Sequence, residues 1–140
     1  MSAPDFLDSN IVIYAYDVSD PRKNAIARDL VKRAQSGEFV ISTQVLAEFC
    51  STFLYKMKPA ASPQDILAIL QVLDPIKTLS PDVDMVRRAV EAHARYGIHV
   101  YDGLIVAAAE RAGCSTIWSE DLNANQKYFG IEVKNPFTTP

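Results

Sequence analysis

Short apolar runs alternate with longer helical patterns along most of the chain, and this alternation limits the fold more than any other feature. Apolar residues recur at helical spacing in the segments between the runs. Alternating strands and helices form right-handed βαβ units, so we expect an α/β fold with a central, mostly parallel sheet and helices on both faces. The runs with strand character are 5–7, 39–41, 76–79, 116–118 and 131–133.

Proline and glycine mark where several of these helices begin and end. Asp20 and Pro21 provide an N-cap and a first helical residue, and Gly37 closes that segment. Ser62 and Pro63 open another helix in the same way. The remaining helices are expected over 11–16, 43–57, 81–97 and 101–113, with a loop at 57–61 and a Ser80–Pro81 start for the third of these.

The length and composition predict a single domain that spans residues 1–140. The chain has 140 residues and is 49% hydrophobic, which is enough for one core. No apolar stretch reaches the roughly 18 residues that a membrane-spanning helix needs. The first residues lack the basic start and apolar middle of a signal peptide. We therefore expect a cytoplasmic protein.

Four acidic residues that are distant in sequence are the candidate functional site. Each follows an apolar run or falls in the first turns of a helical pattern, and such positions meet at one end of an α/β sheet. Carboxylates gathered in one pocket repel each other unless they are protonated or bind a cation, and oxygen ligands favour Mg²⁺ or Mn²⁺. This pattern predicts a metal-dependent hydrolase. The four residues are Asp8, Glu48, Asp102 and Asp121.

Each acid also has a structural interpretation that requires no metal. Asp8 fits an N-cap for the helix that follows it. Glu48 fits a solvated position on a helix, and Asp102 lies where the helix dipole favours an acid. Asp121 fits a turn. The coincidence of all four at strand-to-helix junctions favours a shared site.

Several residues near the acids are candidate auxiliary groups. Asn10 and Ser119 could orient a carboxylate or hold a metal-bound water. Glu120 could replace or supplement Asp121 as a ligand. Exposed aromatic rings can stack on unpaired bases, although core packing is the simpler role. The tyrosines in question are Tyr14, Tyr16 and Tyr101.

The cysteines and histidines do not have the spacing of a zinc or redox site. Cys50 and Cys114 stand alone, so we expect small buried side chains rather than a disulfide. His93 and His99 show no metal-type spacing, and ordinary core or surface roles are favoured. His99 is the nearer of the two to the acidic positions.

The net charge of −3 argues against a nucleic-acid ligand only at first sight. If the four acids belong to a metal site, the remainder of the chain carries +1. The basic residues are clustered, so a phosphodiester substrate would meet metal and basic rim together. The clusters are Arg22–Lys23, Lys32–Arg33, Lys56 with Lys58, and Arg87–Arg88.

Five segments around these residues resemble the successive motifs of the PIN-domain ribonucleases, in particular the VapC-type toxins of toxin–antitoxin pairs. The match covers nearly the whole chain in order. Gly103 departs from the pattern, because the family more often has Ala there, and we expect a looser helix start beside Asp102. The fourth acidic position varies in the family. The segments are 6–15, 41–49, 101–109, 119–122 and 135–137.

This resemblance implies a three-layer α/β/α fold and a Mg²⁺ or Mn²⁺ site formed by Asp8, Glu48, Asp102 and Asp121. It also implies endonucleolytic cleavage of single-stranded or looped RNA, a homodimer, and inhibition by a small cognate antitoxin. The apolar stripe of the helix at 62–73 suggests a surface for self-association. An antitoxin arginine could neutralise the acids.

Three alternatives remain at this stage. A phosphoryl-aspartate enzyme or receiver domain also has an aspartate after its first strand, but Asn10 stands where a haloacid-type phosphatase needs a second acid. An inactive PIN-like interaction module would be expected to lack one of the acids. A PIN ribonuclease that acts in RNA maturation would have the same residues as a toxin.

Overall fold

A five-stranded sheet forms the centre of the protein in a computed structural model that describes residues 3–138. The strand order is β3-β2-β1-β4-β5, and every neighbouring pair is parallel. The predicted parallel α/β fold is therefore confirmed. The strands are β1 (Asp5–Leu7), β2 (Phe39–Ser42), β3 (Lys77–Leu79), β4 (Thr116–Trp118) and β5 (Glu132–Lys134).

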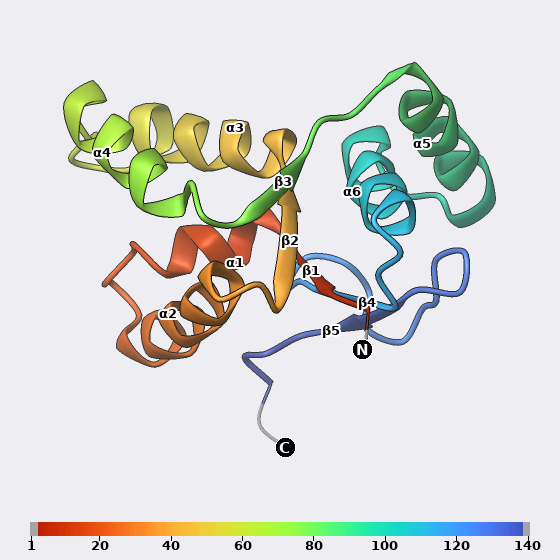
Figure 1. The fold of residues 1–140 in the computed structure, drawn as a ribbon, viewed down its shortest axis with the longest axis horizontal. Coiled ribbons are helices and arrows are strands. Elements are labelled where there is room, and N and C mark those ends of the chain that lie inside the picture. Colours follow the sequence, from red (N-terminus) through yellow and green to blue (C-terminus); the bar gives the residue numbers. More distant parts are fainter. Residues whose placement is uncertain (1–2, 139–140) are drawn as a thin grey trace.

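Helices cover both faces of the sheet. Figure 1 shows α5 and α6 together on one side of the sheet and α1 and α2 on the other. The three layers match the α/β/α expectation. The helices are α1 (Ser9–Tyr14), α2 (Pro21–Gln35), α3 (Thr43–Ser51), α4 (Pro63–Leu73), α5 (Val83–Tyr96) and α6 (Val100–Arg111), and a π-helical segment η1 (Thr52–Lys56) follows α3.

Side-chain caps explain where α2 and α4 begin. The Asp20 carboxylate accepts a hydrogen bond from the backbone N–H of Lys23 at 3.1 Å, and Pro21 takes the first helical position. Ser62 caps α4 by accepting from the N–H of Asp65 at 3.1 Å. Both starts agree with the sequence prediction.

The predicted start of α5 at Ser80–Pro81 was wrong. The helix begins at Val83, because the Asp82 carboxylate accepts from the N–H of Met85 at 2.9 Å and so caps the first turn. Arg111 also pairs with Asp82 at 2.8 Å and holds the cap in place. The predicted helix over 43–57 changes to π-helical geometry at Thr52.

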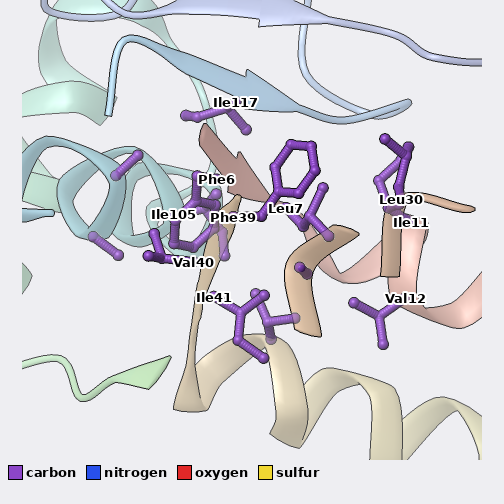
Figure 2. Packing of buried hydrophobic residues seen from close by; sticks show 14 of the residues in the cluster. Phe6, Leu7, Ile11, Val12, Leu30, Phe39, Val40, Ile41, Ile105 and Ile117 are labelled. Atoms are coloured by element: carbon purple, nitrogen blue, oxygen red, sulfur yellow. The ribbon is translucent and has the colours of Figure 1, made fainter. Parts of the chain in front are cut away.

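The apolar core lies on both sides of the three central strands. Figure 2 shows the buried side chains of β1, β2 and β4 packed together with residues of α1, α2 and α6. Four of the six buried residues of α6 are glycine or alanine, so its neighbour α5 can approach closely. The labelled side chains are Phe6, Leu7, Ile11, Val12, Leu30, Phe39, Val40, Ile41, Ile105 and Ile117.

Gly103 lies where α6 packs directly against the backbone of α5. A Cβ atom at this position would lie 2.6 Å from the carbonyl oxygen of Ala89. Glycine is therefore required by the packing of α5. The expected loosening of the helix start is not observed, because α6 is continuous from Val100.

The parallel arrangement brings the carboxyl ends of β1, β2 and β4 to one edge of the sheet. Chain connections leave β1 towards β2 on one side, whereas β4 pairs with β1 on the other. This is a topological switch point, where open α/β sheets form a crevice. Within residues 3–138, no helix is long and apolar enough to cross a membrane.

Candidate acidic site at the strand ends

Asp8 lies directly after β1, and its carboxylate is held by hydrogen bonds from Ser9, Ser119 and Asn10. Only 4% of the residue is exposed. Its Oδ1 accepts from the backbone N–H of Ser9 at 2.7 Å, and its Oδ2 accepts from the Ser119 hydroxyl at 2.8 Å. Asp8 is therefore the N-cap of α1, as one interpretation of the sequence predicted. Its second oxygen faces the end of β4.

The buried amide of Asn10 connects Asp8 to the end of β4. Its Nδ2 donates to Asp8 Oδ2 at 3.4 Å, to Ser119 Oγ at 3.3 Å and to Asp121 Oδ2 at 3.2 Å. Its Oδ1 accepts from the N–H of Glu120 at 3.0 Å. The side chain uses both ends, so it fixes the relative positions of the Asp8 and Asp121 carboxylates.

Ser119 is fully buried and organises the turn that carries Asp121. Its hydroxyl oxygen accepts from the N–H groups of Asp121 at 3.1 Å and of Leu122 at 3.2 Å. The same hydroxyl donates to Asp8. Ser119 therefore joins the Asp8 carboxylate to the turn after β4.

Glu48 and Asp102 approach the same edge from helices α3 and α6. Both residues are half-buried. Gln44, one turn before Glu48, donates from Nε2 to the carbonyl oxygen of Tyr101 at 2.9 Å and so ties α3 to the first turn of α6.

Electrostatic interactions connect the four acids. Burial raises the pKa of Asp8 from 3.8 to about 6, hydrogen bonds from Ser119 and Ser9 oppose the change, and the charges of Glu48 and Asp121 add to it. Burial also raises the pKa of Asp102, with a further contribution from Asp121.

Glu48 completes this group. Burial is the main cause of its raised pKa, and the charge of Asp102 raises it further. Hydrogen bonds from Ser9 and Gln44 and the charge of Lys56 act in the opposite direction. Each of the four acids therefore lies close enough to at least one other to interact with its charge.

The donor set is chemically suited to a hard divalent cation that keeps part of its water shell. All four acidic side chains offer oxygen, and the buried Oε1 of Gln44 beside Glu48 has no hydrogen-bond partner. Among residues 3–138, no three His, Cys, Asp or Glu side chains are arranged to hold a metal ion by themselves. Such an ion would have one or two direct carboxylate ligands, and water would complete its coordination.

The Glu120 side chain, considered as a substitute for Asp121, has its partners outside the acidic group. Its carboxylate pairs with Lys23 of α2 and accepts from the Tyr14 hydroxyl at 2.9 Å. The Lys23 ammonium also lies 5.5 Å from the ring centroid of Phe137. This cluster attaches the chain after β5 to α1 and α2.

The three candidate tyrosines have different surroundings. Tyr14 packs edge-on against Phe137 and Tyr16 against Phe49, so both are occupied with packing. Tyr101, beside Asp102, is 60% exposed. His99 caps α6 by accepting from the N–H of Tyr101 at 3.2 Å. Both cysteines have free thiols in the structure; Cys114 is buried, as predicted, whereas Cys50 is only partly buried.

These features define an α/β/α protein with an acidic site at the switch point of its sheet. The PIN domain family model matches residues 6–130, and the chain belongs to the PIN domain family. The family predicted from the motifs is therefore confirmed. No curated protein matched the chain in the sequence comparison.

Solved structures with the same fold include components of toxin–antitoxin complexes. A DNA-bound VapBC structure from Salmonella typhimurium has a TM-score of 0.66 and 20% identity, over 96% of this chain and 99% of that chain. FitAcB from Neisseria gonorrhoeae has a TM-score of 0.65 and 17% identity, over 96% and 99%. VapC20 of Mycobacterium tuberculosis, a Sarcin-Ricin loop cleaving toxin, has a TM-score of 0.59 and 17% identity, over 84% and 91%. At these identities the likeness establishes the fold.

Proposed function

We propose that this PIN-domain protein is a Mg²⁺- or Mn²⁺-dependent endoribonuclease that cuts single-stranded or looped RNA. The observation that carries the proposal is the group of four mutually repelling carboxylates, with Asp8 buried and held by Asn10 and Ser119. A folded protein keeps such a group at a cost, which a bound cation removes. The RNA-cleaving activity named for VapC20 supports RNA as the substrate class.

In this proposal Asp8 and Asp102 are the main ligands of the ion. Glu48 is a ligand or orients the attacking water, and Asp121 acts through water. When bound, the ion would lower the pKa of a coordinated water and polarise a phosphoryl oxygen.

The remaining residues contribute orientation and charge. Asn10 and Ser119 hold the Asp8 carboxylate in one orientation, which limits the freedom of the ligand oxygens. Lys56 lies close enough to Glu48 to affect its pKa, so it provides positive charge near the edge where a phosphate would approach. Without a metal, burial raises the pKa of Asp8 to about 6, so protons compete with the ion for this carboxylate and we expect metal binding to strengthen as the pH rises.

A toxin role with a small protein inhibitor and a homodimeric state is the favoured biological setting. VapBC and FitAcB are complexes of this fold with a partner. Two apolar residues on the outer side of α4, Leu67 at 65% and Val72 at 52% exposure, are available to a partner or a second copy, while Ile66 and Leu73 are buried. An inhibitor arginine would match the charge of the acidic group.

The nuclease proposal is tested by incubating the purified protein with structured RNA in EDTA, Mg²⁺ or Mn²⁺. We expect cleavage only with the metal ions. Asp102→Asn and Glu48→Gln should lower the rate by orders of magnitude and leave the circular dichroism spectrum unchanged. Asp29→Asn, at an exposed position on α2, is the matched control and should cleave normally. Cleavage in EDTA, or normal cleavage by Asp102→Asn, would refute the proposal.

The alternative of an RNA-maturation enzyme is separated from the toxin by the neighbouring gene. A toxin is expected to have a short upstream reading frame for a small DNA-binding protein, and co-expression of that protein should relieve growth arrest. If the chain causes no growth arrest and cleaves one precursor RNA at a defined site, the maturation role is favoured.

A further inference from the structure

An exposed aromatic pair stands beside the acidic site. The rings of His99 and Tyr101 are stacked, with centroids 5.5 Å apart and an angle of 25° between their planes. Tyr101 is 60% exposed, whereas Tyr14 and Tyr16 are engaged in packing. Tyr101 directly precedes Asp102. The charge of His99 lowers the pKa of Asp102, so the stacked pair lies near that carboxylate. A large flat surface is therefore available near the acidic group.

A cavity of about 460 Å³ adjoins this pair. It lies where α5 ends and α6 begins, and its wall is mainly apolar with two imidazole rings. His99 belongs to both the aromatic pair and the cavity. The lining residues are Val90, His93, Gly97, Ile98, His99 and Val100.

The two imidazoles offer opposite hydrogen-bonding groups when neutral. Nδ1 of His99 accepts from the backbone N–H of Tyr101, so its proton lies on Nε2, which can donate. Nδ1 of His93 is 2.8 Å from the carbonyl oxygen of Ile98, which can only accept, so His93 donates there and its Nε2 can accept. A donor and an acceptor on an apolar wall match the polar edge and the flat face of a nucleobase.

We propose that Tyr101, His99 and His93 form a subsite that binds one unpaired nucleobase of the RNA next to the phosphate at the acidic group. Tyr101 provides the stacking surface, and the two histidines contribute to base preference. This inference rests on the proposed ribonuclease function and adds the element that selects the sequence. A nucleobase fits better than a purely apolar partner because the ring of Tyr101 lies beside a mainly apolar cavity that carries a hydrogen-bond donor and an acceptor.

The test is binding of short single-stranded oligoribonucleotides that carry 2-aminopurine, in the presence of Ca²⁺. Stacking should quench the probe in the wild type. Tyr101→Ala should raise Kd by about fivefold or more, and Tyr101→Phe, which keeps the ring, should retain most of the affinity. His99→Asn keeps a capping side chain for α6 but removes the imidazole, so it should weaken binding and leave the thermal unfolding midpoint nearly unchanged. His93→Ala should change the relative affinities for oligonucleotides that differ at one base.

Tyr55→Ala is the matched control, because Tyr55 is an 80% exposed tyrosine on η1 outside the proposed subsite. It should bind like the wild type. Equal binding by Tyr101→Ala and wild type, or no binding by the wild type, would overturn the subsite. A change from dimer to monomer mass in Tyr101→Ala by light scattering would also overturn it, since the surface would then belong to a second copy.

Cleavage measured in parallel separates this proposal from the ribonuclease proposal. If RNA is cut with Mg²⁺ and Tyr101→Ala neither weakens binding nor changes the cut positions, the subsite alone is wrong. If the oligonucleotides bind in a Tyr101-dependent manner but no metal supports cleavage, the subsite is supported and the nuclease assignment is wrong.

Discussion

Asp8→Asn should make the metal-free protein less sensitive to pH, and the expected size follows from the burial of this residue. Raising the pKa from 3.8 to about 6 costs about 3 kcal/mol when the group is fully ionised, at about 1.4 kcal/mol per pH unit. The folded state keeps its proton to a higher pH than the unfolded state does. The wild type is therefore free of this cost at low pH, and it loses stability as the pH rises towards and through the folded-state pKa. Between about pH 4.5 and about pH 8 the loss is about 2 kcal/mol.

The change conserves the shape of the side chain and most of its contacts. Asparagine caps helices as well as aspartate does, so the bond from the N–H of Ser9 can remain. The NH₂ group of the new asparagine would face the donors of Asn10 and Ser119, because both donate to Asp8 Oδ2 in the wild type. The lost hydrogen bonds lower the stability of the variant by the same amount at every pH. The informative quantity is therefore the difference in free energy of unfolding between variant and wild type, and how that difference changes with pH.

Urea unfolding in EDTA, at several values between about pH 4.5 and about pH 8, measures this quantity. The free energy of unfolding of Asp8→Asn relative to wild type should increase by about 2 kcal/mol across the range. Mg²⁺ should reduce that increase by stabilising the wild type more than the variant. Parallel pH curves for the two proteins would show that Asp8 is not a buried, destabilising carboxylate, and the reasoning would be refuted.

Three further predictions concern packing and burial elsewhere in the fold. Gly103→Ala should lower the free energy of unfolding by roughly 1 to 3 kcal/mol in urea titration, since the added methyl group meets the backbone of α5. Arg88→Lys should cost about 1 kcal/mol in the same assay, because it loses the paired bonds to Glu110 at 2.9 and 2.8 Å and the contact over the Phe129 ring. Cys114, whose pKa burial raises to about 12, should resist alkylation in the native protein at pH values where the unfolded protein reacts, as mass spectrometry can show.

The sequence was sufficient to predict the fold class and the positions of most strands. Strands that alternate with helices can form only a few kinds of sheet, and a parallel sheet built from βαβ units is the main one. It also predicted that Asp8 and Asp121 would meet, since both follow strands of one sheet. Helix starts were less accurate where two caps competed, as at Ser80 and Asp82, because a one-turn difference depends on the partner Arg111.

The sequence could not predict which way each side chain of the site points. Glu120 and Asp121 are adjacent and have the same chemistry, yet Lys23 and Tyr14 draw the first away from the acidic group. The role of Gly103 likewise depends on the distance between two helices, which no local pattern contains.

The hydrogen bonds from Asn10 to Ser119 and Asp121 have a consequence for biosynthesis. They join residues 109 and 111 positions apart in sequence. Closing so long a loop is entropically costly, and contacts of this kind slow folding. A chain that is still being synthesised carries Asp8, Asn10 and Glu48 long before Asp121 is added. The complete acidic group therefore cannot exist on a nascent chain until β4 has paired with β1, so it forms late in the maturation of the protein.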